Sequence, residues 1–149
     1  LVTAGWVFPQ AMTIEEYDPK STLVVPGRSV TRAKFPFVDV HWHANRVNKP
    51  SDVDDLIAQM DKINMQVMVN LSGGTGDRLK QVVQLMKGRH PKRFVIFANF
   101  SFDGMDEPGY SAKLARQLEQ DVKNGAQGLK IFKNFGMDLK DTKGQRVRV

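Results

Sequence analysis

Four short apolar segments alternate with three amphipathic segments between residues 35 and 133. The apolar segments are short enough to form buried strands and comprise residues 35–43, 65–71, 94–100 and 127–133. Between them, apolar side chains recur every three or four positions, as on the buried face of a helix. This spacing predicts helices over Asp52–Ile63, from Asp77 to Gly88, and over Tyr110–Lys123. Such alternation, with short connections, predicts an α/β fold with a parallel sheet.

Capping signals predict the start of the first helix, and apolar spacing predicts the buried face of the third. Ser51 is a good N-cap residue, and Asp54 three positions later completes a capping-box pattern for the first helix. In the third helix, the spacing assigns four side chains to the core: Leu114, Ala115, Leu118 and Val122.

The segments that flank the predicted sheet are less regular. Residues 1–34 show little helical periodicity and contain several proline and glycine breakers. We expect an irregular arm that lies on the core, with a single helical turn starting at Thr13 and an extended stretch over Ser21–Val25. After the fourth strand, Met137–Val149 predicts two short strands around a turn at Asp141–Gly144.

Two architectures are consistent with this order of elements. One is a small, open, doubly wound sheet, and the other is the N-terminal half of a (β/α)8 TIM barrel, which needs about 250 residues. Arg146–Val149 resembles a strand that stops in mid-element, which favours the half-barrel. We therefore expect an arm over residues 1–34. A partial barrel of about four parallel strands then covers residues 35–149, ending after strand four and a short hairpin.

Composition and charge narrow the classes of partner. The chain is 41% hydrophobic and 26% charged, as in ordinary globular proteins, and it has no cysteine, which excludes disulfides and thiolate metal ligands. The net charge is +6, but the lysines and arginines are scattered, without a basic run or interleaved aromatic residues. We expect no nucleic-acid partner, and no membrane partner because no apolar run is long enough to cross a bilayer.

The first residues leave the compartment open. Leu1–Phe8 is consistent either with the tail of a signal peptide or with a loose tail anchored by Trp6 and Phe8. The first interpretation implies a periplasmic or secreted protein, and the second is compatible with a cytoplasmic one.

Two histidines give the clearest chemical signal. His41 and His43 end the first strand at spacing i, i+2, so an extended backbone projects both imidazoles from one face. Two neighbouring imidazoles are reasonable metal ligands, and loop histidines without a ligand role are the alternative. Lys130 lies in the fourth strand, where a lysine is rarely buried unless it is paired or chemically useful. Ligands of parallel α/β folds gather at the carboxyl ends of the strands, where these residues are expected to meet.

Three other polar features have simpler interpretations. The loop Ser72–Gly76 is rich in glycine but fits no phosphate-binding fingerprint, which favours a tight strand-to-helix turn near a site. The acidic residues after the third strand, Asp103, Asp106 and Glu107, fit no calcium loop and indicate a solvated turn. His90 is expected to be a solvent-facing loop residue.

The first strand and several other stretches resemble the amidohydrolase superfamily. Phe35-Pro36-Phe37 followed by Asp39-Val40-His41-Trp42-His43 is similar to its first-strand signature. Within the superfamily, the chain is most similar to the amidohydrolase-related family, which includes decarboxylases of the aminocarboxymuconate-semialdehyde type. The similarity extends over three further stretches: Glu15–Ser21, Arg32–Pro36 and Gly125–Lys133.

The resemblance implies a TIM barrel with one or two divalent metal ions, most often zinc, at its carboxyl face. His41 and His43 match the first-strand metal ligands, and Lys130 matches a position that carries a carboxylated, metal-bridging lysine in several relatives. The family's later histidines and its aspartate general base have no counterparts up to Val149. The resemblance thus implies the N-terminal fragment of a hydrolase that activates water to attack an amide, ester or lactone carbonyl of a small-molecule substrate. A homo-oligomer is left open.

Three alternatives remain at this point. The first is a metal-dependent decarboxylase of the same family. The second is the metal-dependent deoxyribonuclease branch, which usually has a glutamate on strand four where this chain has Lys130. The third is a basic α/β module without catalysis that binds anions through Gly73–Gly76.

Overall fold

The computed structural model of the chain describes residues 12–147. Helices and strands alternate along these residues in the following order: β1 (Phe37–Trp42), α1 (Pro50–Ile63), β2 (Met65–Asn70), α2 (Gly76–Lys87), β3 (Phe94–Ala98), α3 (Tyr110–Lys123), β4 (Gly128–Leu129) and α4 (Asn134–Met137).

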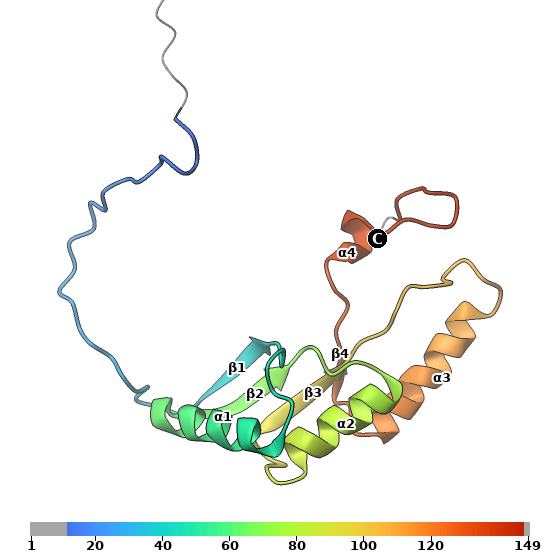
Figure 1. Cartoon of the computed structure of the whole chain (residues 1–149), viewed down its shortest axis with the longest axis horizontal. Helices are drawn as coiled ribbons and strands as arrows, with labels where there is room; N and C mark the ends of the chain where they lie inside the picture. The colour runs from blue at the N-terminus through green and yellow to red at the C-terminus, as the bar shows by residue number, and fades with distance from the viewer. Residues whose placement is uncertain (1–11, 148–149) are drawn as a thin grey trace, which may run out of the picture.

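The four strands form one sheet in chain order, and each neighbouring pair is parallel. Helices α1, α2 and α3 lie along one face of this sheet, and the described residues place no such layer on the other face (Figure 1). The sheet curls, which brings the segment after β4 back to the end of β1, where Phe132 stacks on His43. The prediction of an α/β fold with four parallel strands alternating with helices is confirmed, in the form of a curled half-barrel.

The face of the sheet that meets the helices forms the core. Phe94, Ile96 and Ala98 alternate along β3 and are fully buried. They pack with buried side chains from three other elements: Val53 and Met60 of α1, Met68 of β2, and Leu79, Val82 and Met86 of α2. Because each fully buried aliphatic or aromatic side chain contributes about 1.5–3 kcal/mol, this layer fixes the strands whose ends carry the candidate site.

Apolar side chains at the two edges of the sheet are not covered. Val40 on edge strand β1 is 69% exposed, and Ile131 after β4 is also exposed. In a sheet that curls, these are the edges where further strands would pair.

Helix α1 begins earlier than predicted. Lys49 rather than Ser51 is the N-cap, and Pro50 occupies the first helical position, where a missing N–H costs no hydrogen bond. The carboxylate of Asp52, not that of Asp54, accepts a hydrogen bond from the backbone N–H of Lys49 at 3.2 Å. The prediction of Ser51 as the N-cap, with Asp54 as its partner, was therefore wrong. Pro50 is better accommodated inside the first turn of the helix than before it.

Helix α3 has the predicted bounds but a different inner face. Val122 is 58% exposed and Ala115 is also exposed, so their assignment to the core was wrong. The fully buried residue is Asp121. Helix α3 packs against α2 and β3, and these contacts leave the side chains of Ala115 and Val122 exposed.

Strand β4 is shorter than the predicted span of residues 127–133. It comprises only Gly128–Leu129, although the backbone N–H of Lys130 still donates to the carbonyl of Ala98 at 2.9 Å. The predicted hairpin is likewise reduced to one antiparallel bridge, between Lys140 and Arg146. Its turn at Asp141–Gly144 is present, with a hydrogen bond from the N–H of the glycine to the carbonyl of the aspartate.

The described part of the N-terminal arm does not lie on the core. Residues 12–31 form no strand or helix and run away from the sheet (Figure 1). The predicted turn is present, because the N–H of Glu16 donates to Thr13 Oγ1 at 3.3 Å. Within the described part of the arm, the backbone is attached to the core at its base, where Ala33 donates to the carbonyl of Ile63 at 3.1 Å. The stretch Leu1–Phe8, considered as a signal-peptide tail, lies outside the described residues.

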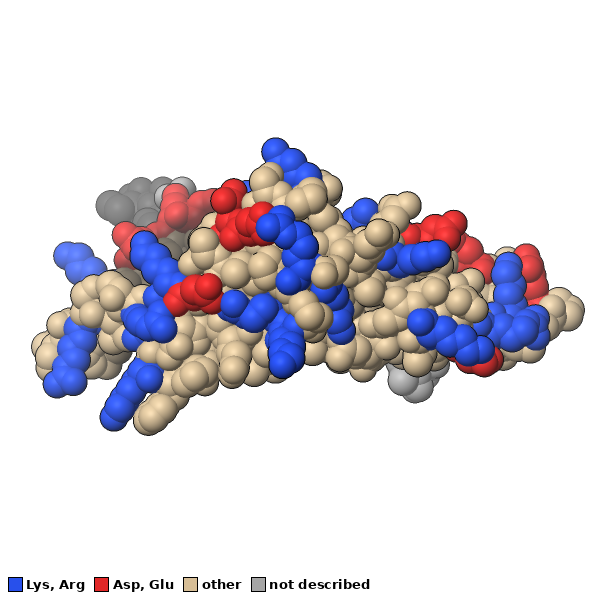
Figure 2. All heavy atoms as spheres, turned by 90° about the horizontal axis from the view of Figure 1, so that it is seen from below, with Lys and Arg blue, Asp and Glu red and all other residues tan. Residues whose placement is uncertain are grey.

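Figure 2 shows the charged side chains on one face of the molecule. On the face drawn in Figure 2, lysine and arginine side chains are separated by uncharged and acidic ones. In the described part of the chain, no helix combines the length and the hydropathy required to cross a membrane.

Candidate functional site

The two histidines of the first strand lie together at its carboxyl end. His41 is the second-last residue of β1, and His43 follows the strand directly. Their imidazole centroids are 5.3 Å apart and the rings are inclined at 64°. Their side chains thus project together, as the spacing of two residues predicts. The backbone N–H of His41 is held locally by the carboxylate of Asp39 at 2.9 Å.

A serine from the neighbouring strand holds His43. Ser72 follows β2, and its Oγ lies 2.6 Å from Nδ1 of His43. The backbone N–H of Ser72 donates in turn to Oδ1 of Asn70 at 2.9 Å. The same oxygen accepts a hydrogen bond from the N–H of Ala44, next to His43, at 3.3 Å. The fully buried amide of Asn70 therefore ties the end of β1 to the end of β2.

Asn99 plays a similar role one strand further along the sheet. Its Nδ2 donates to the carbonyl of Leu71 at 2.9 Å and to that of Lys130 at 3.3 Å. Its Oδ1 accepts a hydrogen bond from the N–H of Gly74 at 3.0 Å. The side chain of Asn99 thus links the ends of β2, β3 and β4. It also fixes the position of the loop Ser72–Gly76 relative to the sheet.

The loop Ser72–Gly76 is a tight strand-to-helix turn, as predicted. A Cβ at Gly73 would lie 2.4 Å from the carbonyl oxygen of Phe97, which no larger residue can accommodate without a shift. Gly74 has φ +81°, a conformation that favours glycine. Glycines are therefore required here by close packing and by backbone conformation.

A buried carboxylate holds the other end of this loop. Asp121 on α3 accepts hydrogen bonds from Thr75 Oγ1 at 2.5 Å, from the N–H of Gly76 at 2.8 Å and from Nε2 of Gln117 at 3.1 Å. The position at the N-terminus of α2 that an anion would take is thus filled by the protein's own carboxylate. This arrangement argues against the interpretation of Gly73–Gly76 as an anion-binding loop.

Lys130 lines a hollow that is connected to the histidine pair through Phe132. The hollow has a volume of about 180 Å³, and its walls include Phe100, Asp103 and Phe132. Phe132 also stacks on His43, with ring centroids 6.0 Å apart and an interplanar angle of 27°. No hydrogen bond joins Lys130 to either imidazole, so the structure brings the two histidines together and does not bring Lys130 into hydrogen-bond contact with them.

The donor set of the histidine pair fits two positions of a metal site. Zinc sites use imidazole nitrogens, and the nitrogen that does not bind metal is usually hydrogen-bonded, as Nδ1 of His43 is to Ser72. Within residues 12–147, no group of three or more histidine, aspartate or glutamate side chains lies close enough to hold a metal ion. The histidine pair could therefore fill two positions of such a site, and further ligands would have to come from outside the described residues.

The acidic loop after β3 is a solvated turn, as predicted. Asp103, Asp106 and Glu107 are exposed, and the carboxylate of Asp103 accepts a hydrogen bond from the hydroxyl of Ser101 at 2.5 Å. Tyr110 anchors the loop by donating from its hydroxyl to the carbonyl of Ser101 at 2.6 Å. Burial raises the pKa of Tyr110, and the neighbouring carboxylate of Asp103 adds to the rise.

The third histidine lies apart from the site but is not a free loop residue. The side chain of His90 is 25% exposed, and its Nε2 lies 3.2 Å from Oδ1 of Asp54. Arg89 pairs with the other oxygen of the same carboxylate at 2.8 Å. His90 is thus a loop residue, as expected, but its side chain is only partly exposed because it pairs with Asp54 on α1.

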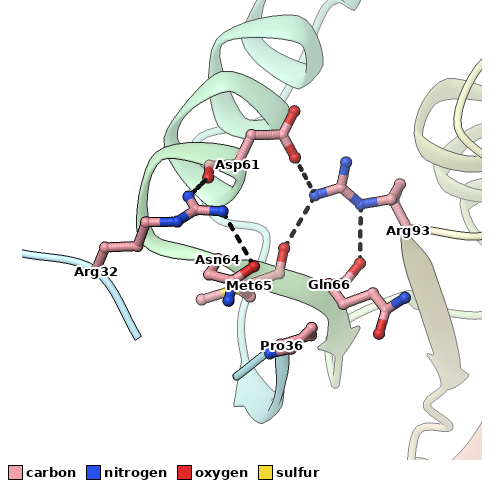
Figure 3. A pocket seen from close by; sticks show the side chains of 7 residues that line it. All are labelled: Arg32, Pro36, Asp61, Asn64, Met65, Gln66 and Arg93. Carbon is pink, nitrogen blue, oxygen red and sulfur yellow. Dashed lines mark hydrogen bonds and ion pairs between the residues drawn. The ribbon is translucent and has the colours of Figure 1, made fainter. Parts of the chain in front are cut away.

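A larger hollow, of about 380 Å³, lies at the opposite end of the strands, near the start of β2 (Figure 3). Arg32 and Arg93 both line it, but both guanidinium groups are bonded to the protein. Arg32 donates to Oδ1 of Asn64 at 3.1 Å, and Arg93 pairs with Asp61 at 2.7 Å and donates to the carbonyl of Gln66 at 2.8 Å. These contacts tie the base of the arm and the start of β3 to the end of α1, so we interpret this hollow as structural.

Four residues that hold the histidines or the strand ends were not predicted to do so: Asn70, Ser72, Asn99 and Phe132. A signal was present for two of them, since Asn70 and Asn99 are the polar residues at the ends of two otherwise apolar strands. Phe132 carried no such signal, because its contact with His43 depends on the curl of the sheet.

Comparisons with family models, with curated proteins and with solved structures find no match to this chain. The functional assignment therefore depends on the geometry of the strand ends.

Proposed function

We propose that this chain forms the first half of a TIM barrel of the amidohydrolase type, in a metal-dependent hydrolase that attacks amide, ester or lactone carbonyls. One observation carries the proposal. The imidazoles of His41 and His43 lie 5.3 Å apart at the carboxyl end of the first strand of a parallel half-barrel, which is the end where barrel enzymes place their chemistry.

In this proposal, His41 and His43 hold a divalent metal, zinc in the first instance, through ring nitrogens. When bound, such a metal lowers the pKa of a coordinated water towards ~7 and polarises a carbonyl oxygen. Ser72 keeps the ring of His43 in place through Nδ1, and Phe132 covers one face of the same ring. We expect the remaining ligands and the general base to come from outside residues 12–147.

Lys130 has a conditional role. Carboxylation would convert its ammonium into an anionic oxygen ligand for a second metal. The lysine and Phe132 line the same hollow, and Phe132 also stacks on His43, but no hydrogen bond joins the lysine to either imidazole. This favours a first metal held by the histidine pair, with Lys130 either carboxylated towards a second metal or available to a substrate anion.

Hydrolysis assays on the purified full-length protein test the proposal. A panel of carboxylic esters, lactones and amides is assayed before and after removal of divalent metal, with release of carbon dioxide from carboxylic acids measured in parallel. We expect hydrolysis that is lost on chelation and restored by zinc, lost in His41→Ala, and retained in His90→Ala, whose histidine lies outside the site. Metal-dependent release of carbon dioxide without hydrolysis would assign the decarboxylase alternative, and activity that survives chelation would overturn the metal-dependent mechanism.

A further inference from the structure

The imidazole of His43 is constrained on two sides. Its Nδ1 lies 2.6 Å from Oγ of Ser72, and the ring of Phe132 stacks against its face. Among residues 12–147, no hydrogen bond is made to Nε2. The ring thus has a fixed orientation, with one nitrogen occupied by the protein and one left for a ligand.

Ser72, which contacts His43, is itself held by the side chain of Asn70. The side chain of Asn70 is completely buried, and its Oδ1 accepts hydrogen bonds from the backbone N–H groups of Ser72 at 2.9 Å and Ala44 at 3.3 Å. Ala44 directly follows His43. One buried oxygen therefore sets the backbone of the histidine and the backbone of its hydrogen-bond partner relative to each other.

The hydrogen bond at the non-coordinating nitrogen of a histidine selects its tautomer, and the hydroxyl of Ser72 can either accept this bond or donate it. We propose that Ser72 and Asn70 are positioning residues for His43. Nδ1–H donates to Oγ of Ser72, so the lone pair of Nε2 is available to a divalent cation. The role of the cation rests on the proposed function, whereas the tautomer is a property of the metal-free protein.

The tautomer is tested by NMR on the metal-free, full-length protein. Long-range proton–nitrogen correlation spectra are recorded in alkaline buffer, where imidazoles are neutral. We expect His43 to show a protonated Nδ1 in the wild type and in Ser72→Thr, which keeps the hydroxyl. We expect Ser72→Ala to lose this preference, and Ser51→Ala, an exposed serine on α1, to leave it unchanged. A protonated Nε2 in the wild type, or an unchanged His43 spectrum in Ser72→Ala, would overturn the proposal.

The contribution of Asn70 is tested with two variants of similar size. Asn70→Asp keeps an acceptor oxygen, and Asn70→Leu removes it while filling most of the space. We expect the ring-nitrogen shifts of His43 to change more in Asn70→Leu than in Asn70→Asp, with circular dichroism used to select conditions where both are folded. Equal shifts in the two variants would reduce Asn70 to a structural residue and leave Ser72 as the positioning group.

Zinc titration separates this inference from the proposed function. We expect Ser72→Ala to weaken the zinc Kd by about 10–100-fold and Ser72→Thr to restore it to within a few-fold of the wild type. If the wild type binds no zinc while the NMR result holds, the proposed function fails and the positioning of His43 stands. If the wild type binds zinc but Ser72→Ala alters neither the zinc Kd nor the His43 spectrum, the positioning fails and the proposed function stands.

Discussion

The ring of Phe132 stacks on the imidazole of His43, with their centroids 6.0 Å apart, although 89 positions separate them in the sequence (132 − 43). The two residues follow β4 and β1, which form the opposite edges of the sheet. Only a sheet that curls can bring these edges together. The contact therefore depends on the curl of the sheet, which places Phe132 against the imidazole of His43 at the end of β1.

Replacing Phe132 with leucine should change the environment of His43 specifically. Loss of the aromatic ring removes its magnetic shielding, so the ring protons of His43 should shift in the NMR spectrum while those of His90 stay in place. Aromatic pairs contribute about 0.5–1.5 kcal/mol beyond area burial, so the protein should remain folded. Unchanged His43 signals would contradict the observed stacking and, with it, the curl of the half-barrel.

Gly73 should tolerate no side chain. A Cβ there would lie 2.4 Å from the carbonyl oxygen of Phe97 and 2.7 Å from Cγ2 of Ile96. We expect Gly73→Ala to lower the free energy of unfolding by about 2–3 kcal/mol, as forced overpacking does in other cores. Urea denaturation measures the loss, and Gly27→Ala on the exposed arm, where nothing lies within 4 Å, is the control with little change expected. Equal stability of the two variants would show that the loop is not packed as described.

Asp121 should matter more for stability than any exposed carboxylate on α3. It accepts three hydrogen bonds, two of them from the start of α2, and it is fully buried. We expect Asp121→Ala to destabilise the protein by about 2–4 kcal/mol, because the N–H of Gly76 loses its acceptor. Asp121→Asn should cost less, since it keeps one acceptor oxygen.

The control for Asp121 is Glu119→Gln on the exposed side of the same helix. Glu119 pairs only with Lys123, at the surface, so its loss should cost under about 1 kcal/mol. Thermal melts of the three variants would reveal the ranking, and a Glu119→Gln melt as low as that of Asp121→Ala would refute it.

Asp54 should make stability depend on pH in the acid range. The hydrogen bond with His90 is the main reason why the pKa of Asp54 lies below its ordinary value of 3.8, and Arg89 adds to this effect. A carboxyl whose pKa is lower in the folded state stabilises the protein above the unfolded pKa, and this contribution is lost as the pH falls through the folded pKa.

Substitution of Asp54 tests this dependence directly. At neutral pH, Asp54→Asn should have a lower denaturation midpoint than the wild type, and the difference should shrink as the pH falls below 3.8. Urea titrations at several pH values measure both quantities, with Asp55→Asn, the exposed neighbour on α1, as the matched control. A difference that grows as the solution becomes more acidic would contradict the assigned direction.

The fold could largely be predicted from the sequence because its signals are local. Apolar runs such as Phe94–Ala98 and the helical spacing of α2 place both kinds of element correctly. The predictions failed where a local signal had two outcomes, as when Asp52 rather than Asp54 capped α1. They were also wrong where packing against other elements decides whether a side chain is buried, as for Val122.

The candidate site could be predicted only in part, for a related reason. The pairing of His41 with His43 follows from the two-residue repeat of a strand, which is a property of the local backbone. The contacts of His43 with Ser72 and Phe132 join three different strand ends, so their geometry depends on strand register and on the curl of the sheet. Neither quantity can be obtained from residue spacing.

The central claim is that His41 and His43 together bind a divalent metal. The most direct measurement is a calorimetric zinc titration of the full-length protein, of the double variant His41→Ala with His43→Ala, and of His90→Ala. We predict that the wild type and His90→Ala bind zinc with the same affinity, and that the double variant loses this binding while keeping its circular dichroism spectrum. Undiminished zinc binding by the folded double variant would contradict the account.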